Sequence, residues 1–129
     1  MNIPLLCIPI AFGLVYAPKV ALSVAMARQP EGYDNKNPRD QQAKLVGWGK
    51  RAAAAHANGF ESFAPFAIGV LVATGTGAHP ETAARLALGY IAARTLYPIM
   101  YLANIDKLRS LVWGLGFAAT FALMVLPLF

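Results

Sequence analysis

The most informative feature of this 129-residue chain is how little charge it carries. Charged residues make up 13% of it and hydrophobic residues 57%, whereas an ordinary soluble domain has about 25% charged residues. This composition excludes most soluble globular proteins and favours a chain whose apolar surface meets lipid. The length allows a single domain, which we expect to span residues 1–129.

Metal-binding side chains are also scarce. The single cysteine, Cys7, cannot form an internal disulfide or make a metal site alone. The two histidines, His56 and His79, fall on opposite sides of one predicted membrane segment and cannot share an ion. We therefore expect no metal site. Membrane topology and anionic lipid explain the basic first loop, so nucleic acid is not an expected partner.

What the chain does have is four apolar segments. We predict helices over residues 3–27, 44–74, 80–104 and 108–128. The polar stretch 28–49 is rich in Asp, Asn and Pro, which predicts turns. A cleaved signal peptide is the alternative for the first segment, but no basic residue precedes it and Lys19 interrupts it. The predicted fold class is an all-α bundle of four transmembrane helices, since about 20 apolar residues cross a bilayer.

The basic residues predict the orientation of these helices. They gather in the first loop (Arg28, Lys36, Arg39, Lys44, Lys50, Arg51) and in the third connection (Lys107, Arg109), while the second connection and both termini have none. Because cytoplasmic loops carry the excess of Lys and Arg, these two connections are expected to face the cytoplasm. Both termini then lie on the non-cytoplasmic side.

Three charged residues lie inside the predicted membrane segments at similar depth. Counted from the cytoplasmic helix ends, Lys19, Glu61 and Arg94 lie roughly 14, 15 and 18 Å inside. An isolated charge near the bilayer centre costs at least about 2.5–3.5 kcal/mol, so we expect these side chains to face inward and pair. Such a layer either sets helix register alone or surrounds a polar cavity. Further hydrogen-bonding groups favour the cavity: Asn58, Tyr97, Tyr101, Arg109 and Ser110.

Three motifs stand in a characteristic order along the chain. They are Arg51…Asn58-x-x-Glu61…Pro65, Arg94-x-x-Tyr97-x-x-x-Tyr101 and Leu108-Arg109-Ser110. In this order and topology they resemble the MAPEG family, the membrane-associated proteins in eicosanoid and glutathione metabolism. The resemblance spans nearly the whole chain. It implies a homotrimer with glutathione sites between subunits, open to the cytoplasm. Without a eukaryotic targeting signal, it also implies a divergent bacterial-type member in an inner membrane.

The resemblance assigns roles to individual residues. Those that would bind glutathione are Arg51, Asn58, Glu61, Arg94, Tyr97, Tyr101 and Ser110. Arg109, at the start of the fourth helix, would act in catalysis by stabilising the glutathione thiolate, because a nearby cation favours that form. Asp40 is a second catalytic candidate, since its loop is similar to one that carries a catalytic aspartate in a family member.

The chain departs from the family pattern just before Asn58. Members that bind glutathione usually have an arginine four residues before the asparagine, where this chain has Ala54, and Ala57 occupies another position that can be basic. Arg51, seven residues before Asn58, is a candidate to compensate, and so are Lys44, Lys50 and Arg28. Two functions stay open. One is a glutathione-dependent transferase or peroxidase acting on lipophilic electrophiles from the bilayer, and the other is a non-catalytic lipid-binding or scaffold protein of the same fold.

Overall fold

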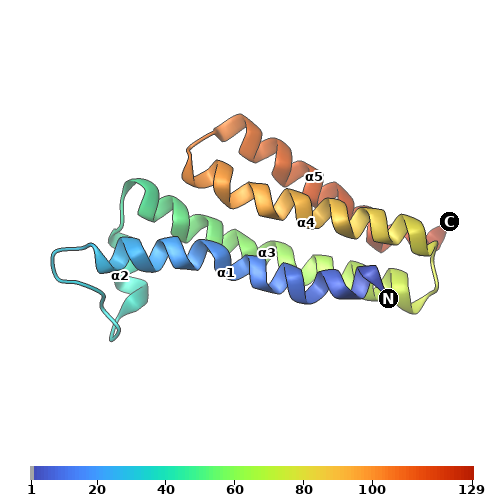
Figure 1. Ribbon diagram of the computed structural model, residues 1–129, viewed down its shortest axis with the longest axis horizontal. Coiled ribbons are helices and arrows are strands. Elements are labelled where there is room, and N and C mark those ends of the chain that lie inside the picture. Colours follow the sequence, from blue (N-terminus) through green and yellow to red (C-terminus); the bar gives the residue numbers. More distant parts are fainter. Residues whose placement is uncertain (1) are drawn as a thin grey trace.

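The computed structural model describes residues 2–129, which form helices and turns without a strand (Figure 1). The elements are α1 (Ile3–Ala27), α2 (Pro38–Lys44), α3 (Gly47–Gly75), α4 (Pro80–Leu102), α5 (Asp106–Val125) and the 3₁₀ turn η1 (Leu126–Leu128). The four long helices run side by side, and both termini lie at the same end as the α3–α4 connection (Figure 1). We call the opposite end, which holds α2 and the α4–α5 turn, the loop end.

The short helix α2 is the main departure from the predicted order of elements. Pro38 stands at its beginning, where a missing backbone N–H is tolerated, and Asp40 lies in its first turn near the positive end of the helix dipole. The chain then turns at Gly47, whose φ of 58° favours glycine. A separate helix therefore occupies part of the stretch that the sequence predicted as turns, and α3 begins only after it.

Two segments, α1 and Asp106–Leu128, are long and apolar enough to cross a membrane. Within residues 2–129, α3 and α4 do not reach the same hydropathy, because charged residues such as Glu61 and Arg94 interrupt them. All four long helices nevertheless expose large apolar side chains, among them Val20, Ile68, Ile99 and Phe117. An apolar surface of this extent is suited to lipid.

Helices α1 and α3 pack unusually closely because small residues line their contact. A Cβ atom added to Gly49 would lie 2.9 Å from the Cβ of Ala25, and one added to Gly59 would lie 3.2 Å from the Cα of Val15. The Nδ1 atom of His56 lies 2.8 Å from the Val15 carbonyl oxygen, within hydrogen-bond distance. These contacts fix the register of the two helices, which run in opposite directions.

This register corrects the predicted depth of Lys19. It places Lys19 level with Ala55 of α3, six positions before Glu61, which corresponds to roughly 9 Å along the helix axis. The only ion pair within residues 2–129 joins Arg85 Nη2 to Glu81 Oε2 at 3.4 Å, near the end with the termini. The three membrane-embedded charges therefore do not pair with one another in a single copy of the chain.

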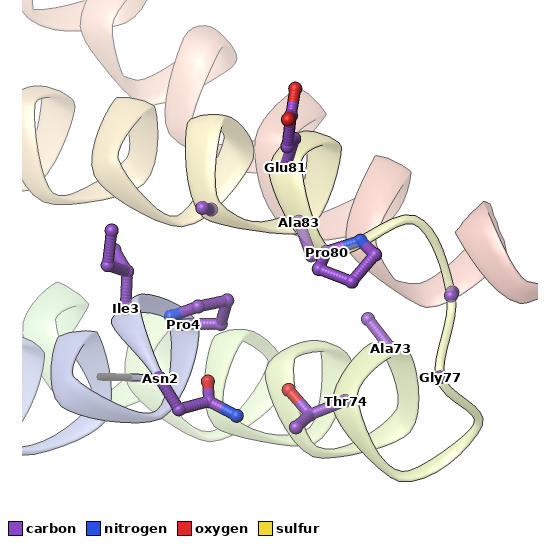
Figure 2. A pocket seen from close by; sticks show the side chains of 11 residues that line it. Asn2, Ile3, Pro4, Ala73, Thr74, Gly77, Pro80, Glu81 and Ala83 are labelled. Carbon is purple, nitrogen blue, oxygen red and sulfur yellow. The ribbon is translucent and has the colours of Figure 1, made fainter.

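At the end with the termini, a cavity of about 520 Å³ opens between the beginnings of α1 and α4 and the end of α3 (Figure 2). Its walls are mostly apolar, and the Glu81 carboxylate points away from it. The Thr74 hydroxyl beside the cavity is buried and has no hydrogen-bond partner within residues 2–129. Packing at this end is therefore less complete than at the α1–α3 contact.

Candidate functional site

A continuous series of polar contacts begins in the middle of the bundle. The Nη1 atom of Arg94 donates a hydrogen bond to Asn58 Oδ1 (3.0 Å), and Asn58 Nδ2 donates to Glu61 Oε2 (3.1 Å). Arg94 is 7% exposed and its guanidinium lies 4.4 Å from the centre of the Tyr97 ring. Asn58 therefore links the buried arginine of α4 to the exposed glutamate of α3.

The series continues from α4 to α5 at the loop end. The rings of Tyr97 and Tyr101 meet edge to face with their centres 5.6 Å apart, and the Arg109 guanidinium lies 4.5 Å from the Tyr101 ring centre. The spacing of three and four residues places Arg94, Tyr97 and Tyr101 on one side of α4. We call the whole chain of contacts, from Glu61 to Arg109, the polar series.

Two cavities adjoin the polar series and share Trp113. The first, of about 490 Å³, lies at the loop end and is lined by Tyr97, Tyr101, Arg109, Ser110, Trp113 and Gly114. The second, of about 300 Å³, lies between α3 and α5, and its lining is mainly apolar: Asn58, Glu61, Ser62, Pro65, Trp113, Phe117, Thr120, Phe121 and Met124. A compartment with a guanidinium and hydroxyl groups therefore lies next to an apolar one.

The structure brings together most of the residues that the sequence singled out. Seven of them belong to the polar series or line these cavities: Asn58, Glu61, Arg94, Tyr97, Tyr101, Arg109 and Ser110. Asn58 and Glu61 of α3 are distant in sequence from the residues of α4 and α5, and the packing of α3 against these two consecutive helices makes them neighbours.

Two predicted site residues lie elsewhere. Arg51 donates from Nε and Nη2 to the Leu102 carbonyl oxygen (3.3 and 3.2 Å), so it caps the C-terminal end of α4 and places its charge near the negative end of that helix dipole. Asp40 is exposed on α2, and no hydrogen bond or ion pair within residues 2–129 joins it to the polar series. Neither residue lines the two cavities.

Two residues of this site, Trp113 and Ser62, were not predicted from the sequence. Trp113 follows Arg109 by four residues, and this spacing alone would have placed both side chains on one face of α5. Ser62 lines the apolar cavity, and its Oγ lies 2.9 Å from the hydroxyl of Tyr90. Tyr90 in turn stacks on Phe66 with ring centres 3.7 Å apart. No sequence pattern near Ser62 predicts its contact with Tyr90. Through Tyr90 and Phe66, this contact connects the apolar cavity to the buried core.

The fold and this site define an all-helical protein in which two helices are long and apolar enough to cross a membrane and a polar compartment lies at one end of the helices. The sequence model of the MAPEG family matches residues 4–129, and the chain belongs to the MAPEG family. The family match confirms the resemblance found in the sequence and makes this a membrane protein of the glutathione and eicosanoid metabolism family. In comparisons with curated proteins and with solved structures, nothing matches the chain.

Proposed function

We propose that the protein is a glutathione-dependent transferase or peroxidase that acts on lipophilic electrophiles entering from the bilayer. The observation that carries this proposal is the pairing of two compartments around Trp113, one with polar groups and one mainly apolar. Glutathione is charged and polar, whereas the electrophile is apolar. The two compartments therefore match the two reactants, and they adjoin where a reaction would have to occur.

The functional unit in this proposal is a homotrimer of four-span subunits in a bacterial inner membrane, with both termini on the non-cytoplasmic side. Two features support the topology. The termini lie at one end of the bundle (Figure 1), and the basic residues of the first loop and of the α4–α5 turn lie at the other. The polar compartment is at that basic end, so it would open toward the cytoplasm, where glutathione is available.

Arg109 and Ser110 would act on the glutathione sulfur. The Arg109 guanidinium rests on the Tyr101 ring and lines the polar compartment together with Ser110. A fixed cation next to a thiol lowers the thiol pKa and favours the nucleophilic thiolate. The thiolate would then displace a leaving group from an electrophile in the apolar compartment, forming an S–C bond. With a hydroperoxide it would attack the terminal oxygen, so that an S–O bond forms, the O–O bond breaks and the alcohol leaves, and a second glutathione would reduce the sulfenic acid to the disulfide and water.

Asn58 and Glu61 would hold the peptide part of glutathione. Asn58, Glu61 and Ser62 form a polar edge of the mainly apolar compartment, and glutathione would reach this edge from the polar compartment beside it. The exposed Glu61 carboxylate accepts a single hydrogen bond, from Asn58, so it has capacity left for a ligand ammonium group. Hydrogen bonds between charged groups are about twice as strong as neutral ones. The Arg94–Asn58 bond holds the amide in place, which orients Glu61 before the ligand arrives.

A second candidate function is a non-catalytic lipid-binding or scaffold protein. The observation that favours it is the shortage of cations on α3 near Asn58. Ala54 and Ala57 stand where basic residues can occur, and Arg51 is engaged with the Leu102 carbonyl. Each charge-assisted contact that glutathione carboxylates would lose contributes about 1.5–3 kcal/mol.

Calorimetric titration of glutathione into the detergent-purified protein separates the two functions. Binding in the micromolar to low-millimolar range, lost in both Arg109→Ala and Glu61→Gln and kept in the control Arg85→Gln, is the result that we expect. Turnover assays with standard electrophiles and lipid hydroperoxides would follow. A folded wild-type protein that releases no heat on titration would favour the scaffold function instead.

A further inference from the structure

Two opposite charges in the apolar part of the chain have no ionic partner in one copy. Within residues 2–129, the Lys19 side chain makes no hydrogen bond or ion pair, and Glu61 accepts a bond only from Asn58. Lys19 is half-buried and Glu61 is exposed. Both would be partly exposed to lipid in an isolated copy, and a charge in lipid is unfavourable unless another group pairs with it.

The two charges lie on opposite flanks of α3. Lys19 follows Phe12 by seven residues and Tyr16 by three, so it shares their side of α1. The Phe12 ring packs on Phe63 of α3, with ring centres 5.6 Å apart. Glu61 precedes Phe63 by two residues, which places the two side chains about 160° apart around α3. Lys19 therefore borders one flank of α3, and Glu61 borders the other.

Both flanks are apolar surfaces that would suit a protein neighbour. The flank with Lys19 exposes Phe12, Tyr16 and Phe60, and the flank with Glu61 exposes Trp113, Phe117 and Phe121. Each flank thus combines exposed aromatic rings with one unpaired charge, and the charges have opposite sign. Two different surfaces of one chain that fit each other give a head-to-tail contact, which closes into a ring when the rotation allows it.

The directions of the two side chains reduce their difference in depth. Their backbone positions differ by roughly 9 Å along the bundle, because Lys19 lies nearer the loop end. Side chains on a helix lean toward its N-terminus. Since α1 and α3 run in opposite directions, Lys19 leans away from the loop end and Glu61 leans toward it. The ammonium and the carboxylate therefore approach the same level.

We propose that Lys19 of one copy pairs with Glu61 of the next copy inside the membrane. The proposal rests on the homotrimer put forward above and adds the contact that would hold it together. It also assigns to the neighbouring copy a residue of the glutathione site, because that ammonium would fix the Glu61 carboxylate beside Asn58. A single copy has an incomplete site, in which Glu61 faces lipid.

Thiol cross-linking between differently tagged copies tests this contact. One chain carries Lys19→Cys and the other Glu61→Cys, both with Cys7→Ser so that the native thiol is absent. After co-expression and treatment of the membranes with a short bismaleimide, we expect a product that carries both tags. The control pairs Lys19→Cys with Arg85→Cys. Arg85 lies near the beginning of α4, at the end of the bundle with the termini, whereas Lys19 lies nearer the loop end. No mixed-tag product from chains that remain oligomeric by native mass spectrometry would overturn the proposal.

Exchange of the two charges provides a test that does not depend on cross-linking. Lys19→Glu and Glu61→Lys each place like charges at the contact, so each variant alone should shift the oligomer toward monomers in native mass spectrometry. The double variant restores an opposite pair and should recover the oligomer. A double variant as dissociated as the two single variants would contradict the pairing.

Glutathione titration distinguishes failure of this contact from failure of the proposed function. Wild-type protein that binds glutathione but gives no mixed-tag product would refute the contact and leave the function standing. Protein that cross-links but does not bind glutathione would support the contact and refute the function.

Discussion

The α1–α3 contact and the surroundings of the polar series are built from opposite kinds of residue. Between α1 and α3, glycine and alanine bring the backbones together, as at Gly49 and Ala25. Gly69 also brings α3 close to α5, but around the polar series long polar and aromatic side chains line two cavities. The comparison shows that one side of α3 is fixed by close packing, so that its other side can hold Asn58 and Glu61 steady at an open site.

The largest effect on glutathione binding is expected at Asn58, which lies on the open side of α3. Asn58→Ala removes the acceptor of Arg94 and the donor to Glu61. Hydrogen bonds to charged groups contribute about 1.5–3 kcal/mol, so we expect glutathione affinity to fall roughly 10- to 150-fold in calorimetry. Thr95→Ala is the control, because that exposed hydroxyl bonds only to its own helix. Equal affinities for the two variants would remove Asn58 from the site.

Gly49 tests the closely packed side. Gly49→Ala brings a Cβ to 2.9 Å from the Ala25 Cβ, which cannot rotate away. Overpacking of this kind destabilises proteins by about 1–3 kcal/mol, so the melting temperature in detergent should fall. Gly89→Ala is the matched control, since nothing lies within 4 Å of its new Cβ, and alanine in a helix is favoured over glycine by about 0.5–1 kcal/mol. A shift in the same direction for both variants would argue against the close contact.

Substitution of Arg51 tests whether this residue stabilises the fold or binds the ligand. Arg51→Gln removes the charged cap from the Leu102 carbonyl, and loss of a typical hydrogen bond destabilises by about 0.5–1.5 kcal/mol. We expect a lower melting temperature with unchanged glutathione affinity, measured beside the neighbouring control Lys50→Gln. Weaker glutathione binding in Arg51→Gln alone would instead return Arg51 to the ligand site that the sequence suggested.

The smallest effect is expected at Arg85. Its ion pair with Glu81 joins two side chains that are 81% and 88% exposed, and such helix pairs contribute about 0.3–0.5 kcal/mol. Arg85→Gln should therefore barely change the melting temperature, whereas Glu61→Gln should lower it, because Glu61 belongs to the polar series. Equal melting temperatures for these two variants would count against a membrane-embedded role for Glu61.

The long helices could be located from the sequence because their apolar runs determine their extent. The first was expected over residues 3–27, and α1 spans Ile3–Ala27. The ends near the loops were displaced by two or three residues, and α2 was not foreseen. A positive φ at Gly47 decides where α3 begins, and composition does not reveal which glycine of a polar stretch adopts that conformation.

The candidate site was predictable only where helical spacing determines it. Arg94, Tyr97 and Tyr101 share a side of α4 because they stand three and four residues apart. Arg51 has the same kind of position on α3, but its long side chain finds an acceptor 51 residues away, at Leu102. The partner of a flexible cation depends on which helix ends come near it, and that depends on the tertiary packing.

The Thr74 hydroxyl, which has no hydrogen-bond partner among residues 2–129, marks a loosely packed part of the bundle. It lies beside the 520 Å³ cavity at the end with the termini (Figure 2), whereas the loop end is joined by the Gly49–Ala25 contact and the Arg51 cap. Local unfolding begins where the fewest buried contacts must be given up. Backbone amides at the beginnings of α1 and α4, which line this cavity, should therefore exchange with solvent hydrogen faster than those around Phe66 and Tyr90 in the adjoining buried core, so fluctuation is expected at the helix ends farthest from the polar series.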